Sequence, residues 1–232
     1  MNANFDNLNL LTAWVPDSTT AVTEFITKAL LNSAESSAPD IFLKLYFIDA
    51  TNSFPISQFQ ETIPICDENN HIYENIRITT CLDLNELLIN INKMTQLIAI
   101  NRFKKQQKSD NSAKQSIKDQ QGICRSGILV FINGIEIMFR NSQIKSSNEK
   151  SHYLLREAML KLRVMANQYT PSEEETSLKT VLQFPVTEVF ASTSKDLSQN
   201  KKNGKRMKNK QHIKGNTVGE YICKFYVDQI VS

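Results

Sequence analysis

Glycine and lysine are absent from the place where a nucleotide-binding protein would need them. A phosphate-binding loop uses several glycines to expose backbone N–H groups, followed by Lys and Ser or Thr for phosphate and Mg²⁺. The candidate position is Asp49–Phe59, which follows an early apolar run and contains neither residue. The only Gly-Lys pair, Gly204-Lys205, follows no predicted strand. These absences argue against a Walker A motif and against ATP hydrolysis.

Cysteine, histidine and long apolar runs are also scarce. The four cysteines form no C-x-x-C pair, and the three histidines do not pair with them at the spacing of a zinc finger. No run approaches the length of a membrane span, and the N-terminus lacks the basic-then-apolar order of a secretory signal. Neither G-x-S-x-G nor H-E-x-x-H occurs. We therefore expect reduced cysteines, no metal or cofactor, and a cytosolic or nuclear protein.

The most informative stretch that is present is Gly127–Arg140, GILVFINGIEIMFR. Its apolar run Ile128–Ile132 is typical of a strand buried on both faces, as in a parallel sheet covered by helices. In a nucleotide-hydrolysing domain such a strand would end in an acidic residue that organises Mg²⁺. The residue here is Asn133, a neutral amide. The sequence therefore also lacks a Walker B motif.

Alternation of strands and helices predicts one α/β domain over residues 1–232, with a mostly parallel sheet flanked by helices. Aromatic and branched residues favour a strand near the C-terminus at Tyr221–Val227, although Val218, Tyr221, Ile222 and Phe225 also fit a helix. The other predicted strands are Ile41–Ile48, His71–Thr79 and Leu178–Phe184. The predicted helices run from a cap at Asp17 to Leu31, from a cap at Asp83-x-x-Glu86, and over Asn148–Ala166.

Three polar segments are predicted as mobile insertions, at about residues 102–122, 168–177 and 191–216. The third carries most of the positive charge: residues 195–214 hold eight Lys or Arg and one Asp, a net charge of +7. The other residues hold 19 basic and 23 acidic side chains, a net charge of −4. This local basicity points to one contact with an anionic partner. The five lysines within residues 102–121 are either solvated or an auxiliary nucleic-acid contact.

Four long blocks resemble a known family. They are FIDATNSFPISQFQ at Phe47–Gln60, IYENIRITTCLDLNEL at Ile72–Leu87, INGIEIMFRNSQIKSS at Ile132–Ser147 and SHYLLREAMLKLRVM at Ser151–Met165. Together they are similar to the family of chromosome segregation in meiosis protein 2, a subunit of the Shu complex of budding yeasts. The resemblance covers almost every predicted element and fails mainly in the polar insertions.

The resemblance implies a RecA-like core without nucleotide chemistry and a nuclear protein in DNA repair. It implies an obligate heterodimer with the other RecA-like Shu subunit, the platinum-sensitivity protein, within the four-subunit complex. It further implies a non-catalytic role together with the recombinase paralogues. That role is to promote or stabilise the recombinase filament on single-stranded or forked DNA in homologous recombination and error-free damage tolerance.

Two sets of residues carry the expected contacts. Phe54, in the loop after Ile41–Ile48, either binds the recombinase paralogues, as the resemblance implies, or folds back onto its own core. The basic residues match the family's DNA-facing loop in position and charge, and they contain no aromatic for base stacking. They are Lys201, Lys202, Lys205, Arg206, Lys208 and Lys210.

Two other functions stay open. One is a diverged ATPase that completes a shared nucleotide site with a partner. The other is a pure scaffold whose basic loop serves only nuclear import.

Overall fold

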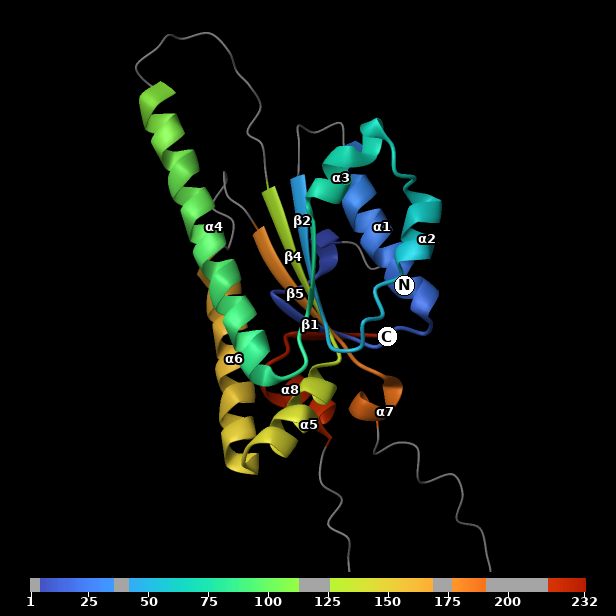
Figure 1. The fold of residues 1–232 in the computed structure, drawn as a ribbon, viewed down its shortest axis with the longest axis vertical. Coiled ribbons are helices and arrows are strands. Elements are labelled where there is room, and N and C mark those ends of the chain that lie inside the picture. Colours follow the sequence, from blue (N-terminus) through green and yellow to red (C-terminus); the bar gives the residue numbers. More distant parts are fainter. Residues whose placement is uncertain (1–4, 36–41, 113–125, 169–176, 191–216) are drawn as a thin grey trace, which may run out of the picture.

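The computed structural model describes residues 5–35, 42–112, 126–168, 177–190 and 217–232, which form a sheet with a helical layer on each face (Figure 1). The sheet has six strands in the order β3-β2-β4-β5-β1-β6, and every neighbouring pair is parallel. The strands are β1 (Leu11–Trp14), β2 (Phe42–Asp49), β3 (Ile76–Thr80), β4 (Ser126–Asn133), β5 (Ser177–Gln183) and β6 (Gln229–Val231). The predicted α/β fold with its parallel sheet is confirmed.

The described residues contain eight α-helices. The α-helices are α1 (Thr19–Glu35), α2 (Ile56–Thr62), α3 (Asn70–Glu74), α4 (Leu84–Ser112), α5 (Ile135–Lys145), α6 (Asn148–Gln168), α7 (Val186–Val189) and α8 (Val218–Phe225). Two 3-10 turns, Phe5–Asn7 and Asp67–Asn69, complete the described part of the chain. None of these helices is both long enough and apolar enough to cross a membrane.

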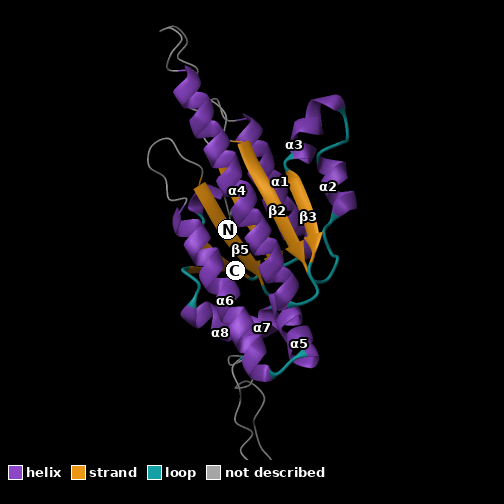
Figure 2. Ribbon diagram, turned by 60° about the vertical axis from the view of Figure 1, so that its left-hand side comes forward, coloured by secondary structure: helices purple, strands orange, loops and turns teal. Residues whose placement is uncertain are grey.

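The strand predicted at Ile128–Ile132 is the centre of the fold. β4 pairs with β2 on one side and β5 on the other. Val130 and Ile132 face the core under α4 and α6, whereas Leu129 and Phe131 face the core under α1 and α2. Figure 2 shows α4 and α6 lying across one face of the sheet. Burial on both faces explains why the run is apolar without alternation.

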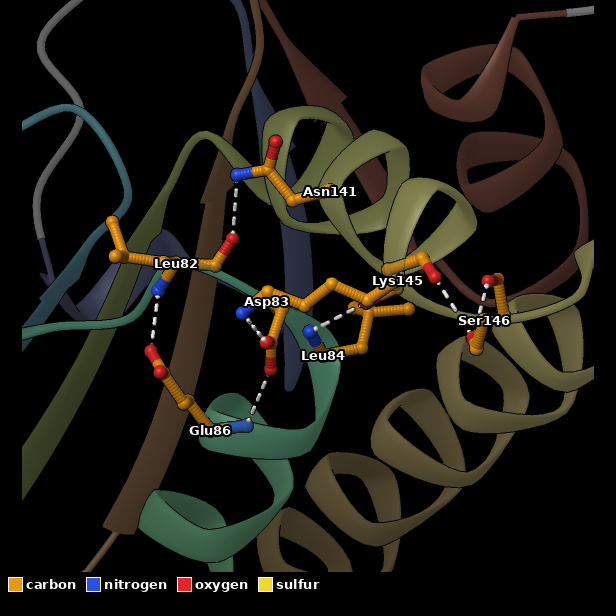
Figure 3. A network of polar contacts seen from close by, with 9 residues as sticks. Leu82, Asp83, Leu84, Glu86, Asn141, Lys145 and Ser146 are labelled. Carbon is orange, nitrogen blue, oxygen red and sulfur yellow. Dashed lines mark hydrogen bonds and ion pairs between the residues drawn. The ribbon is translucent and has the colours of Figure 1, made fainter.

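The start of α4 is fixed by the predicted capping residues (Figure 3). The Asp83 carboxylate accepts a hydrogen bond from the Glu86 N–H at 3.0 Å, and the Glu86 carboxylate accepts one from the Leu82 N–H at 2.7 Å. Lys145, at the end of α5, donates to Asp83 at 2.6 Å. Burial alone would raise the pKa of Asp83, but the hydrogen bonds from Lys145 and Glu86 outweigh it and lower that pKa. The cap therefore also ties α4 to α5.

The polar insertion predicted at about residues 102–122 is wrong in its first half. α4 continues through Ser112. The stretch from Arg102 to Ser112 is polar, but it contains no Pro or Gly and is rich in Lys, Gln and Arg, which are good helix formers. Low apolar content signals exposure and does not by itself end a helix. Residues 113–125 lie outside the described residues, as do residues 169–176 of the insertion predicted at 168–177 and all of the one predicted at 191–216.

Three further assignments differ from the prediction. The predicted strand His71–Thr79 divides into α3 and β3. The C-terminal segment is a helix followed by a short strand, because α8 carries a capping box between Thr217 and Glu220. α1 is capped by the hydroxyl of Ser18, which accepts from the Ala21 N–H at 3.2 Å, and not by Asp17.

α5 was not predicted. Gly134, with φ of +79°, turns the chain from β4 directly into this helix. A Cβ at Gly134 would lie 2.9 Å from the Cβ of Ala50, so the turn also needs the space that glycine leaves. The buried residues of α5 include Ile135, Met138 and Phe139, which follow helical spacing.

Candidate nucleic-acid interface

The carboxyl ends of all six strands meet at one edge of the sheet, because the strands are parallel. α5, α7 and α8 cluster beyond this edge, at the lower end of the molecule in Figure 1. The basic residues predicted to bind DNA, Lys201, Lys202, Lys205, Arg206, Lys208 and Lys210, lie between α7 and α8 and outside the described residues. The structure describes α7 and α8, the helices on either side of this segment, and we call them its anchors.

These two anchors contact each other. The Thr217 hydroxyl, just before α8, donates a hydrogen bond to the carbonyl oxygen of Glu188 in α7. Thr217 also accepts from the Glu220 N–H at 3.1 Å, which closes the capping box. A Cβ at Gly219 would lie 2.6 Å from the Glu188 carbonyl oxygen, so glycine allows the two helices to approach. The chain therefore leaves and re-enters the fold at neighbouring points.

A charged cluster ties the anchors to α5. Arg140 of α5 forms an ion pair with the Glu188 carboxylate. Glu136, one turn earlier in α5, is 6% exposed, and one of its carboxylate oxygens has no hydrogen-bond partner. Burial raises the pKa of Glu136, the negative charge of Glu188 raises it further, and Arg140 opposes the rise. The Arg140 charge thus stabilises the negative charge of two carboxylates, those of Glu136 and Glu188.

A second polar cluster lies at the ends of β2 and β4. Asp49 is 1% exposed, and its carboxylate accepts from the N–H and hydroxyl groups of Thr51 and Ser53 and from the side-chain amide of Asn133. The Asn133 amide nitrogen lies 3.1 Å from Asp49 and 2.9 and 2.8 Å from the hydroxyl oxygens of Thr51 and Ser53. Asn52 has φ of +55°, which closes the turn. The Asp49 carboxylate therefore already accepts hydrogen bonds from these donor groups.

The strand order places the expected position of a phosphate loop after β1, not after β2. The chain leaves β1 towards β2, but it leaves β5 towards β6, on the other side of β1. β1 and β5 are adjacent, so the switch point of the sheet lies between them, and the first βα turn is Val15–Ser18. The prediction that placed this position at Asp49–Phe59 is therefore wrong. The turn Val15–Ser18 (VPDS) also contains neither glycine nor lysine.

Phe54 lies in the loop after β2, which the hydrogen bonds from Thr51 and Ser53 to Asp49 stabilise. Its side chain is partly buried, with ring centroids 4.9 Å from Phe47 and 5.9 Å from Phe59. Ile56, two residues later, is 55% exposed. Phe54 therefore packs on the core with one part and leaves another part at the surface. A role in partner binding stays a prediction.

The fold defines an α/β protein with a parallel sheet, and the helices that precede and follow its basic segment in the chain, α7 and α8, lie beyond the carboxyl edge of that sheet. A family model described as "Shu complex component Csm2, DNA-binding" matches residues 11–227. The chain is 37% identical over 227 residues to chromosome segregation in meiosis protein 2 of Saccharomyces cerevisiae, covering 97% of this chain and 98% of the relative. It is 34% identical over 230 residues to the protein of the same name from Candida glabrata, covering 97% of each. The chain belongs to the Csm2 family of DNA-binding Shu complex components.

Proposed function

We propose that this chain is a non-catalytic subunit of a Shu complex that promotes assembly or stability of the RecA-type recombinase filament on single-stranded DNA. The setting is homologous recombination and error-free DNA damage tolerance, in the nucleus. Membership of a DNA-binding Shu family is the observation that carries the proposal. The +7 charge of residues 195–214, set against −4 for the other residues, gives that family property a physical basis in this sequence.

The proposed mode of DNA binding is neutralisation of phosphates. Lys and Arg side chains in a segment without Phe, Tyr or Trp attract the DNA backbone and do not read bases. The contact between Glu188 and Thr217 holds both ends of this segment at one point of the fold. A basic segment joined to the fold at both ends can follow a DNA strand while the rest of the subunit contacts proteins.

The proposed partners are the sister RecA-like subunit, the platinum-sensitivity protein, the remaining Shu subunits and the recombinase paralogues. Exposed apolar side chains on the outer face of α4 support a protein partner. Ile89, Leu97 and Ile100 are each at least 50% exposed and lie on the side of the helix opposite its buried residues. A chain that is obligately paired should aggregate when it is expressed alone and become soluble when the sister subunit is co-expressed.

The test uses the co-expressed heterodimer and labelled single-stranded and forked DNA. We expect saturable binding that weakens with salt and does not depend on base sequence. A nucleotide titration on the same preparation addresses the ATPase alternative. Saturable, Mg²⁺-dependent ATP binding at this subunit would contradict the proposal, and absence of DNA binding would leave the scaffold alternative.

A further inference from the structure

Aromatic rings form a continuous row across α5, α6 and α8, near the anchors of the basic segment. The ring of Phe139 lies 4.9 Å from that of His152, and His152 lies 6.2 Å from Tyr221. Tyr221 in turn lies 5.1 Å from Phe225 and 5.9 Å from Tyr226, measured between ring centroids. The row begins at the buried Phe139 and ends at the surface with Phe225.

Phe225 is the exposed end of this row. Its side chain is 58% exposed, although α8 buries Ile222 completely. A single exposed apolar residue is normal at a protein surface. Phe225 differs because Tyr221 supports its ring from within the fold, while the Lys224 ammonium lies 5.3 Å from its centroid. The ring is therefore supported by Tyr221 and has a cation over it.

Cationic side chains lie near the row, and an ion pair neutralises one of them, Arg163. Arg163 donates to the carbonyl oxygen of Tyr226 at 2.9 Å and forms an ion pair with Asp228 at 2.6 Å. Burial raises the pKa of Tyr226 to about 12, and the charge of the nearby Arg156 opposes that rise. Tyr226 therefore stays neutral near pH 7 and adds no negative charge. Exposed Lys224 and Arg156 complete a surface that combines aromatic faces with cations.

We propose that Phe225, supported by Tyr221, is a stacking platform for bases of single-stranded DNA, with Lys224 and Arg156 contacting the adjoining phosphates. The inference rests on the proposed DNA-binding function and deepens it. Stacking on aromatic rings tolerates any base, since every base has a π-face, and basic residues beside the ring hold the backbone. α8 starts at Val218, directly after the segment that contains the basic residues. The basic segment has no Phe, Tyr or Trp between residues 195 and 214, and the surface on α8 supplies such a ring.

The test compares Phe225→Leu and Phe225→Trp with the wild type in the full-length chain, purified with its partner subunits. Leucine keeps an apolar side chain but has no π-face, so Phe225→Leu should bind labelled oligo(dT) about five- to tenfold more weakly. The salt slope should not change, because no phosphate contact is removed. Affinity for blunt duplex DNA should also stay the same, since paired bases cannot stack on a side chain. Melting temperature should hardly move, because Phe225 is exposed.

Phe225→Trp provides a direct readout. The only native tryptophan of this chain, Trp14, is 8% exposed, so quenching by oligo(dT) beyond that of the wild-type complex would report on the introduced indole. The matched control is Tyr153→Leu, since Tyr153 is an aromatic on α6 that is 64% exposed. This control should bind oligo(dT) like the wild type.

Three outcomes would overturn the inference, and they are distinguishable. Wild-type affinity in Phe225→Leu together with no quenching in Phe225→Trp would assign this surface to a protein partner. An equal loss in Phe225→Leu and Tyr153→Leu would indicate a general effect of surface hydrophobicity. If the wild type itself failed to bind single-stranded DNA, the proposed function would fall as well.

Discussion

Replacing Asn133 by Asp tests the interpretation of the cluster at the ends of β2 and β4. The substitution restores the acidic residue that a nucleotide-hydrolysing domain would have at the end of this strand. It also removes the amide that donates to Asp49 at 3.1 Å and puts a second carboxylate there. Because Asp49 is 1% exposed and already accepts from Thr51 and Ser53, the new charge would meet a negative group with little solvent around it.

Charge repulsion, and its relief by solvent and protonation, determine how far Asn133→Asp lowers the free energy of unfolding. Repulsion between unit charges 3.1 Å apart is about 5 kcal/mol at an effective dielectric constant of about 20. That value is an upper bound, since Asn133 is half-buried and protonation of one carboxyl would relieve the repulsion. We therefore expect Asn133→Asp to lower the free energy of unfolding by about 2–3 kcal/mol at pH 7.

The stability deficit of Asn133→Asp should depend on pH in one direction. In the variant, the paired carboxyls would have a raised pKa in the folded state, so the folded state would bind more protons than the unfolded state. The deficit relative to the wild type should shrink as the pH falls from 7 to 5. Asn133→Ala, which removes the donor without adding charge, is the control, and its deficit should not depend on pH. Urea denaturation at both pH values measures all three proteins. A stable, pH-independent Asn133→Asp would refute the reasoning.

Three further predictions concern single residues. Asp83→Ala removes the cap of α4 and should lower the free energy of unfolding by roughly 1 kcal/mol. Because the pKa of Asp83 is lowered in the folded state, this stabilisation is present above the ordinary pKa of 3.8 and is lost as the pH falls through the folded pKa. Acid titration of both proteins would show this loss. Gly219→Ala puts a Cβ 2.6 Å from the Glu188 carbonyl oxygen and should cost about 1–3 kcal/mol; a wild-type melting temperature would mean that α7 and α8 do not approach as described. Phe54→Ala should weaken capture of the recombinase paralogues and lower the melting temperature moderately, whereas Phe54→Leu should retain stability; if Phe54→Leu also captures them normally, an aromatic contact is wrong.

The central strand could be predicted from the sequence because its pattern allows one solution. Ile128–Ile132 is short, apolar and rich in branched residues, and it lies between Gly127 and Asn133. A strand buried on both faces is the structure that fits such a run. The cap at Asp83 was equally clear, since Glu86 follows at the spacing of a capping box.

Other elements were ambiguous for identifiable reasons. Residues 218–225 fit both a strand and a helix by periodicity, and the deciding signal was the T-x-x-E pattern from Thr217 to Glu220. α5 was missed because a single glycine, Gly134, separates it from β4. Contacts between distant residues, such as that of Glu188 with Thr217, depend on how the helices dock, which no local pattern encodes.

The salt dependence of DNA binding in a basic-segment variant tests the central claim most directly. The variant changes Lys201, Lys202, Lys205 and Arg206 together to Ala, and the measurement is fluorescence anisotropy with single-stranded and forked DNA at several salt concentrations. Each lost phosphate contact should reduce the log–log slope by roughly 0.7, so the slope should flatten by about two to three units, equally across DNA sequences. An unchanged slope would contradict the account and leave the segment as an import signal or an inert tether.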